Sequence, residues 1–462
     1  MNDDTIAAIA TGAGGSIAII RMSGPDAIPF ADRIWKGRNS LQKARPRTML
    51  LGRILSAEDS SKDEMDDHCL VVKMPAPRSY TGEDVVEFHC HGGSMVARIV
   101  LARLLSIGAR LADPGEFTRR AFINGKMDLT QAEAVMDVIE AQTDMALHAA
   151  NRQLAGELGR RVNVIDDALT KILAEIEVRM DFTDEDLDWE STQAMAGKLA
   201  EAATQIDDLL RYRAEGEILR HGIRLVIVGA PNAGKSSLLN LLLGRDRAIV
   251  TDIPGTTRDT LEEFAHIRGI PVQLVDTAGI REATDIVEQH GVARSYSSLQ
   301  QAQVVIWLLD LTRPLAEQSI ATENLTGKSL IIALNKCDAS GAHTWLDVSA
   351  LPPDATYADL PTPLPGISAE SPVLPISALK GHGFDALLDA IEQNVWGSPH
   401  HETPDVAVSA RHCAYLEEAE RQITAAIEVL VSEDFDMLAV NLRSAITALG
   451  TITGRTVQPD IL

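Results

Sequence analysis

Hydrophobic positions in the first 120 residues alternate in short runs, with a longer helical stretch after them. The runs 16–22 and 85–89 have the period of half-buried strands, and residues 95–107 have the period of a helix. Strands and helices mixed in this way are typical of an α+β fold. We therefore expect residues 1–120 to form an N-terminal α+β domain.

Two further regions have a helical period and lie on either side of an α/β region. Apolar residues recur at three- and four-residue steps from residue 130 to about 214, and again at 406–454. Neither region has an obvious complete core of its own. We therefore predict one helical domain in two segments, 121–216 and 396–462, with another domain inserted at 217–395, since the ends of an inserted domain lie close in space.

One segment of the α/β region matches the pattern GxxxxGK[ST]. Residues 229–236 follow a buried strand at 224–228 and open a helix, which is the context of a phosphate-binding loop. Backbone N–H groups and the helix dipole then converge on phosphate oxygens, Lys235 adds a catalytic point charge, and Ser236 can ligate Mg²⁺. The alternative is a glycine-rich turn without a ligand. The loop residues predicted to bind GTP are Asn232, Ala233, Gly234, Lys235, Ser236 and Ser237.

Three more segments follow in the order that a guanine-nucleotide site needs. The first ends an apolar strand, so that its aspartate lies beside the metal and its glycine can offer an N–H to the terminal phosphate. In the second, a carboxylate can accept hydrogen bonds from N1 and the exocyclic amine of guanine, a donor pair that adenine lacks. The third resembles the backbone contact of G proteins to the guanine oxygen. The segments are Asp276-Thr277-Ala278-Gly279, Asn335-Lys336-Cys337-Asp338 and Ser377-Ala378-Leu379, and together they predict a Ras-like P-loop GTPase domain.

The loop after the P-loop helix is the predicted first switch. In an ordinary GTPase, a threonine of this loop closes over the γ-phosphate and completes the Mg²⁺ shell, and Thr257 is the candidate. A Ras-like enzyme has a water-orienting glutamine after the glycine of the second switch, whereas this chain has Ile280. Glu288 is the candidate acid in its place, although Glu282 is closer in sequence. The predicted nucleotide contacts of the first switch are Thr251, Asp252, Ile253, Pro254, Gly255, Thr256 and Thr257.

Several motifs lie outside the inserted domain and are specific in combination. They are residues 4–11, 21–25, 79–87 with 90–93, and 114–134. Together with the nucleotide motifs, they resemble the bacterial tRNA uridine-modifying GTPases of the MnmE (TrmE) type over nearly the whole chain. The resemblance implies GTP hydrolysis that depends on K⁺ and on dimerisation of G domains, without an arginine finger.

The resemblance assigns the K⁺ site and the water-orienting acid. Asn232 matches the family's K⁺ ligand, and Thr251, Ile253 and Thr256 match the loop that completes the cation site. K⁺ at this position would offset transition-state charge as an arginine finger does in other GTPases. Glu288 matches the family's water-orienting acid. From the residues alone, the favoured interpretation of Asn232 is a helix-start residue that satisfies its own backbone.

The resemblance also assigns a ligand to the N-terminal domain. This domain resembles the tetrahydrofolate-binding fold of glycine-cleavage aminomethyltransferases, and in the family it is also the interface of the homodimer. Arg21, Glu87 and Lys126 match positions that line the folate pocket. A carboxylate suits the donors of the pterin, and cations suit its glutamate tail. Taken singly, each of the three is more often part of a surface or structural ion pair.

Charge constrains how tRNA is bound. The net charge of -24 argues against broad adhesion to RNA, which needs clustered Lys and Arg. Small basic groups occur at Arg119–Arg120 with Lys126, at Arg160–Arg161, and at Arg220 with Arg224, and the expected role of each is a solvated helix face. The family implies a FAD-containing partner of the MnmG (GidA) type, which forms a heterotetramer with the homodimer, uses FAD and NADH, and would carry much of the tRNA contact.

The predicted function and location follow from these features. The sequence has no apolar run of about 18 residues and no charged-then-apolar start, so we expect no membrane span or secretory signal. Four scattered cysteines fit a reducing cytoplasm. We predict a cytoplasmic GTPase that drives addition of an aminomethyl or carboxymethylaminomethyl group to C5 of the wobble uridine of certain tRNAs. The alternatives are a regulatory or ribosome-assembly GTPase, and a folate-dependent aminomethyltransferase with a regulatory G domain.

The family's C-terminal motif has no counterpart in the printed sequence. Chains of this family continue past the match to residues 460–462 and end in a Cys-x-Gly-Lys tail, whose cysteine is needed for uridine modification. None of the four cysteines of this sequence, Cys413 included, has that context. We therefore expect GTP hydrolysis without the tail, and uridine modification only with it.

Overall fold

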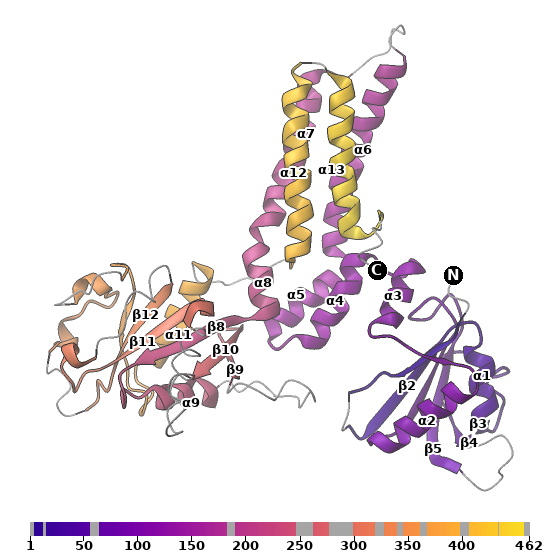
Figure 1. Ribbon diagram of the computed structural model, residues 1–462, viewed down its shortest axis with the longest axis horizontal. Helices are drawn as coiled ribbons and strands as arrows, with labels where there is room; N and C mark the ends of the chain where they lie inside the picture. The colour runs from indigo at the N-terminus through magenta and orange to yellow at the C-terminus, as the bar shows by residue number, and fades with distance from the viewer. Residues whose placement is uncertain are drawn as a thin grey trace, which may run out of the picture. The chain divides into compact units, whose positions relative to one another are not determined.

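The computed structural model describes most of the chain, in two compact units. The described residues are 4–12, 15–55, 64–182, 190–245, 262–276, 299–318, 328–339, 345–360, 367–397, 406–432 and 434–456. Among them, one unit contains residues up to 135 together with 453–456, and the other contains residues 136–452 (Figure 1). No helix within these ranges is long and apolar enough to cross a membrane.

The first unit is built on a mixed sheet with helices on one face. The sheet has the order β3-β4-β5-β6-β2-β1-β7, in which only the β1–β7 pair is parallel. Figure 1 shows α1 and α2 on one face, where Ile20, Met22 and Phe88 are buried against them. Buried residues alternate with more exposed ones along these strands, so the face of the sheet that the helices cover is the one shielded from water. The elements are β1 (Ile6–Ile9), β2 (Ile17–Ser23), α1 (Ala27–Ile34), β3 (Trp35–Gly37), β4 (Leu50–Leu55), β5 (Glu64–Met74), β6 (Val85–His91), α2 (Ser94–Ser106), β7 (Arg110–Leu111) and α3 (Glu116–Ile123).

The second unit contains a bundle of long helices drawn from two distant segments of sequence. Figure 1 shows α6, α7, α12 and α13 side by side, and their apolar stripes form one core that includes Leu169, Ile206, Leu416 and Leu442. Each segment supplies only part of this core, so each needs the other to bury its apolar face. The helices are α4 (Leu129–Glu140, which begins in the first unit), α5 (Asp144–Leu154), α6 (Glu157–Asp181), α7 (Thr192–Arg211), α8 (Arg213–His221), α12 (Ala410–Leu430) and α13 (Phe435–Thr453).

Serine caps fix where two of the bundle helices begin. The Ser191 hydroxyl accepts a hydrogen bond from the Ala194 N–H at the start of α7. The Ser409 hydroxyl accepts one from the His412 N–H at the start of α12. Such caps satisfy N–H groups that have no partner within the helix.

The second unit also contains a six-stranded sheet of the order β13-β12-β11-β8-β10-β9, parallel except for the β9–β10 hairpin. Every residue of β11 is buried, as expected for a central strand covered on both faces. The carboxyl ends of parallel strands share one edge, where α/β proteins bind ligands. The elements are β8 (Ile223–Gly229), α9 (Lys235–Arg245), β9 (Glu262–Ile267), β10 (Ile270–Asp276), β11 (Val304–Asp310), β12 (Ser329–Asn335), β13 (Val373–Pro375) and α11 (Phe384–Trp396).

Candidate nucleotide site

The P-loop connects the end of β8 to the start of α9. Asn232 and Gly234 have positive φ angles of 64° and 102°, which turn the loop tightly. A Cβ atom at Gly234 would lie 2.3 Å from the Asn335 Nδ2 atom, so only glycine fits there. The Lys235 Nζ atom donates to the carbonyl oxygens of Gly229 (3.0 Å) and Ala230 (2.9 Å). The predicted phosphate-binding residues therefore form a compact loop at the carboxyl edge of the sheet, and Ser236 and Ser237 lie exposed in the first turn of α9.

Asn335 joins three of the predicted nucleotide segments. Its Nδ2 atom donates to the Ala233 carbonyl oxygen at 2.7 Å, and its Oδ1 atom accepts from the Ala378 N–H at 2.9 Å. The residue is 3% exposed and ends β12, between the P-loop and the segment after β13. Within the segment Ser377-Ala378-Leu379, which we predicted to contact the guanine oxygen through its backbone, the Ala378 N–H bonds to Asn335 and Leu379 is exposed.

Asp338 is held ionised beside the predicted base-binding segment. Hydrogen bonds from Ser377 and from Lys380 lower the pKa of this carboxyl below the usual aspartate value. The Lys380 Nζ atom lies 3.2 Å from the Asp338 Oδ2 atom. An ionised carboxylate can only accept hydrogen bonds, which is the property that guanine N1 and its amine require.

A pair at the ends of β11 and β12 was missed in the sequence analysis. The Lys336 Nζ atom lies 2.6 Å from the Asp310 Oδ2 atom. Burial by itself would raise the pKa of Asp310, but hydrogen bonds from Lys336 and Thr312 hold it below its usual value. The signal was the all-apolar strand before Asp310, because an acid at the carboxyl end of a central parallel strand lies at the ligand edge.

The switch residues lie mostly outside the described residues. Asp276 ends β10, which pairs in parallel with β8, so its backbone reaches the same edge as the P-loop. The structure thus brings together the P-loop, Asn335 to Asp338, and Ser377 to Leu379. The predicted residues outside the described ranges are Thr251, Asp252, Ile253, Pro254, Gly255, Thr256, Thr257, Thr277, Ala278, Gly279 and Glu288.

The predicted folate residues of the first unit are only partly brought together. Arg21 and Glu87 face each other across β2 and β6, and their Nε and Oε1 atoms lie 2.8 Å apart. The Arg21 guanidinium lies over the Tyr80 ring, 5.1 Å from its centroid, which is a cation–π contact. Lys126 instead donates from Nζ to the Pro77 carbonyl oxygen at 3.1 Å.

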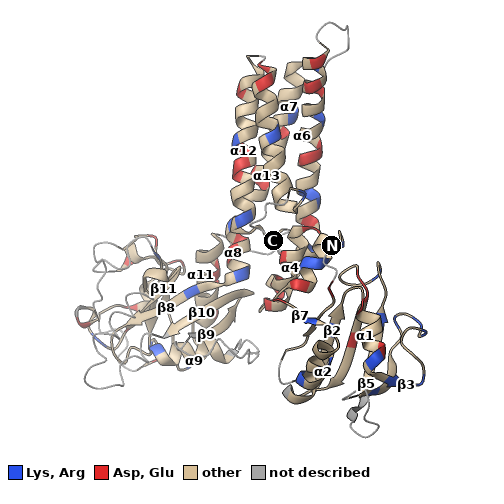
Figure 2. Ribbon diagram, turned by 45° about the vertical axis from the view of Figure 1, so that its right-hand side comes forward, with Lys and Arg blue, Asp and Glu red and all other residues tan. Residues whose placement is uncertain are grey.

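The basic groups of the sequence are mostly neutralised by acidic neighbours. Figure 2 shows Lys and Arg intermixed with Asp and Glu along the helices. Arg160 and Arg161 both bond to Glu157, and Arg220 pairs with Asp137. The expectation of a solvated helix face was wrong for Arg120, whose side chain is 3% exposed. Glu116 of the same helix is one of its partners, but Asp4 and Glu83 come from other parts of the first unit, so the residue pattern along α3 did not reveal its burial.

The proline-rich stretch 352–375 contains ordered structure in its described part. It contains the 3-10 helix η4 (Tyr357–Asp359). Ala355, Tyr357 and Leu360 are buried in the cluster that contains Trp307 of β11. This segment therefore covers one face of the nucleotide domain, because apolar residues between the prolines had a sheet to pack against.

Comparisons with known proteins agree with the two-unit architecture. A family model described as the MnmE helical domain matches residues 129–462, and one described as the GTP-binding protein TrmE N-terminus matches residues 5–126. Proteins named "tRNA modification GTPase MnmE" from Clostridioides difficile (strain 630) and Geobacter sulfurreducens are each 42% identical, over 100% of this chain and 97% of theirs. The FeoB G-domain of Methanococcus jannaschii aligns at 28% identity over 37% of this chain and 97% of its own, with a TM-score of 0.26.

Proposed function

Because the chain belongs to the MnmE (TrmE) family of tRNA modification GTPases, we propose that it hydrolyses GTP and that this reaction drives modification of tRNA. The observation that carries the proposal is the Asn335 side chain, which bonds to both the P-loop and the segment after β13. This link between the predicted phosphate-binding loop and the predicted base-binding segment supports a site in which one guanine nucleotide would span both. The boundaries 1–120, 121–216, 217–395 and 396–462 are our proposed domains.

The P-loop residues have the chemistry that nucleoside triphosphate hydrolysis needs. Lys235 bonds to carbonyl oxygens of its own loop and can exchange them for phosphate oxygens, which adds positive charge where negative charge develops. The exposed Ser236 hydroxyl at the start of α9, with Thr257, would hold Mg²⁺. When bound, Mg²⁺ would neutralise part of the negative charge of the phosphate groups. Glu288 would orient the attacking water.

We further propose that K⁺ is a cofactor. The exposed Asn232, held at a positive φ of 64°, would contribute a hard carboxamide oxygen, and Thr251, Ile253 and Thr256 would complete the site. GTP turnover should then be at least about tenfold faster in K⁺ than in Na⁺ at equal ionic strength, on the scale of other electrostatic catalytic contacts. Steady-state phosphate release measures this, and equal rates in the two salts would remove the K⁺ role.

For the complete reaction, we propose a cytoplasmic homodimer that acts with a FAD-containing partner of the MnmG type. The modified position would be C5 of the wobble uridine of certain tRNAs, with a tetrahydrofolate derivative as one-carbon donor and NADH used by the partner. The Arg21–Glu87 pair beside Tyr80 supports a folate site, because it offers a cation and a carboxylate next to an aromatic ring. Lys126 would join them only when a ligand draws it from Pro77.

Mass spectrometry of tRNA nucleosides from cells that lack the gene tests this function. We expect the modified wobble uridine to disappear and to return when the full-length gene is restored. An Asp338→Asn variant should fail to restore it, since losing a charge-assisted acceptor weakens GTP binding about 10- to 100-fold. An unchanged nucleoside profile in the deletion strain, with purified protein still hydrolysing GTP, would instead favour a regulatory or ribosome-assembly GTPase.

A further inference from the structure

Asp310 lies at the nucleotide edge of the sheet but belongs to none of the nucleotide motifs. It ends β11, is 1% exposed, and bonds through Oδ2 to the Lys336 Nζ atom at 2.6 Å. Lys336 follows Asn335, which bonds to the P-loop, and precedes Asp338, which is predicted to bind the guanine base. Lys336 therefore lies in the chain between the residue that contacts the P-loop and the residue predicted to bind the base. Its ammonium group is held by the ion pair with Asp310.

The carboxylate of Asp310 is itself fixed by a small buried network. Its Oδ1 atom accepts from the Thr312 N–H at 2.9 Å and from the Thr312 hydroxyl at 2.6 Å. The Gln318 side chain accepts from the Asp310 N–H at 2.6 Å and donates to the Asp310 carbonyl oxygen at 2.8 Å. Gln318 is also 1% exposed. Hydrogen bonds on both sides leave this acid little freedom, so it can act as a rigid anchor.

The same turn reaches the phosphate end of the site. The Arg313 Nη1 atom donates to the Pro231 carbonyl oxygen of the P-loop at 3.2 Å. The turn after β11 therefore touches the P-loop on one side and carries the anchor of Lys336 on the other. A shift of this turn would change the loop and the lysine together.

We propose that Asp310 is a positioning residue for the guanine nucleotide, which it holds indirectly by fixing the ammonium of Lys336 at the edge of the site. This inference rests on the proposed function. An ammonium has three donors, and the bond to Asp310 uses one, so the same Lys336 can also bond to an oxygen of the nucleotide. The Lys336 side chain is 36% exposed, so a ligand can reach it. Without the anchor, the lysine samples many rotamers, and binding has to restrict them.

A double-mutant cycle separates this role from a general effect on folding. The variants are Asp310→Asn, Lys336→Met and the two combined, with the dissociation constant of a fluorescent GDP analogue as readout. We expect each single variant to bind about tenfold more weakly or worse, on the scale of one lost charge-assisted bond. In the Lys336→Met background, Asp310→Asn should change the constant by less than about twofold, because the residue it acts through is already gone.

Two further variants serve as controls, one for the loss of an unrelated ion pair and one for a weakened Asp310 network. Asp389→Asn breaks an ion pair of the same domain, Arg268 Nη2 to Asp389 Oδ1 at 2.6 Å, which is exposed and should leave GDP binding unchanged. Thr312→Val removes a hydroxyl bond but keeps the Asp310 charge, and it should weaken binding by a few-fold. Thermal unfolding without nucleotide shows whether each variant is folded.

The outcomes are distinct. GDP binding by a folded Asp310→Asn variant that equals the parent, or losses that simply add in the double variant, would overturn the positioning role and leave the proposed GTPase function intact. Failure of the parent protein itself to bind guanine nucleotide, in the presence of Mg²⁺, would overturn the proposed function and this inference with it.

Discussion

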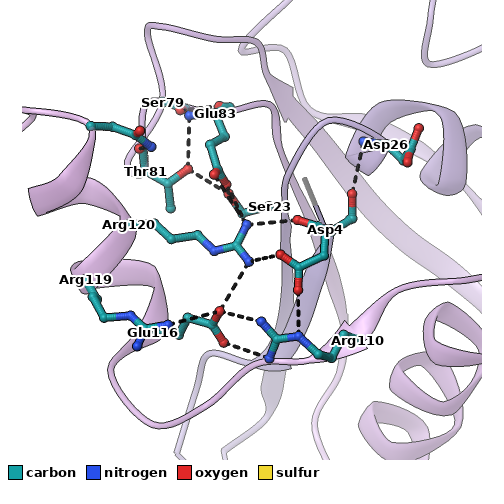
Figure 3. Close-up of polar contacts among 12 residues, drawn as sticks. Asp4, Ser23, Asp26, Ser79, Thr81, Glu83, Arg110, Glu116, Arg119 and Arg120 are labelled. Carbon is teal, nitrogen blue, oxygen red and sulfur yellow. Dashed lines mark hydrogen bonds and ion pairs between the residues drawn. The ribbon is translucent and has the colours of Figure 1, made fainter. Parts of the chain in front are cut away.

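Two polar networks of this protein contrast in how completely their charges satisfy one another. In the first unit, Arg110 and Arg120 close on Asp4, Glu83 and Glu116 (Figure 3). The Arg120 and Glu116 side chains are 3% and 0% exposed. At the nucleotide edge, the acids are likewise held, but the cations Lys336 and Lys380 remain 36% and 55% exposed.

One of the two networks stabilises the fold, and the other has donors left for a ligand. The cluster of the first unit ties Asp4, which precedes β1, to β7 and α3, and its Arg120 bonds to three separate acids. Arg120 and Glu116 are buried, and Arg110, although 42% exposed, already bonds to the two acids Asp4 and Glu116, so we interpret this cluster as structural. Lys336 and Lys380 each bond to one acid and keep donors that can bind phosphate or base oxygens, which supports the nucleotide site that we propose at this edge.

Arg120→Met should produce the largest effect. It leaves Glu116, Glu83 and Asp4 without their shared cation, and removal of one partner of a buried ion pair costs about 3–5 kcal/mol. Hydrogen exchange measured by mass spectrometry should show faster exchange in α3 and β1, with GDP affinity unchanged. If the amides of α3 and β1 exchange as slowly as in the parent protein, the cluster around Arg120 does not stabilise the first unit.

Acid should open the same cluster at a pH set by Glu116. Burial would raise its pKa, but bonds from Arg110, the Asp113 N–H and Arg120 lower the pKa of Glu116 to about 2, against 4.5 for the free side chain. Between these pH values the unfolded chain binds the proton and the folded chain does not. The stabilisation is therefore full above about pH 4.5 and is lost as pH falls toward 2, on the order of 3 kcal/mol.

Denaturant unfolding of the first unit as a function of pH measures this loss. A Glu116→Gln variant is the control, because it has no proton to bind at this position. Its stability should be lower at neutral pH and should depend less on pH between 4.5 and 2. Parallel curves for the two proteins would show that another acid controls the transition.

Asn335→Ala should affect the proposed nucleotide edge more than the cluster around Arg120. The change leaves the Ala233 carbonyl and the Ala378 N–H without this buried partner, at a cost on the order of 2 kcal/mol. We expect GDP affinity to fall about 30-fold, because the P-loop and the base segment are no longer joined. Calorimetric titration measures it, and hydrogen exchange in α3 should stay as in the parent. Unaltered GDP affinity would contradict the link.

Arg211→Ala should have the smallest effect. Arg211 pairs with Asp207 and Asp208 on the surface of α7, and its side chain is 69% exposed. Such solvated helix pairs contribute less than about 0.5 kcal/mol. The free energy of unfolding of this variant, measured with a chemical denaturant, should therefore lie within about 0.5 kcal/mol of the parent value. A larger loss would mean that exposure does not separate the structural ion pairs from the dispensable ones.

The contiguous parts of the nucleotide site were predictable from sequence. A ligand that touches successive residues of one loop imposes a fixed spacing, so the P-loop and the segment Asn335 to Asp338 are visible in the printed letters. Helical and strand periods likewise located the main elements of both units. The roles of the individual predicted site residues stay predictions, including those of Glu288 and Thr257, which lie outside the described residues.

Sequence motifs predict which loops carry phosphate and base chemistry, and the hydrophobic periods located the main helices and strands. Three pairings became visible only in the folded molecule: Arg120 with acids up to 116 positions away, Arg21 with Glu87 across 66 positions, and Asp310 with Lys336. The physical reason is that partners of this kind are selected by strand register and helix packing, which depend on the whole chain. A local motif needs only its own backbone.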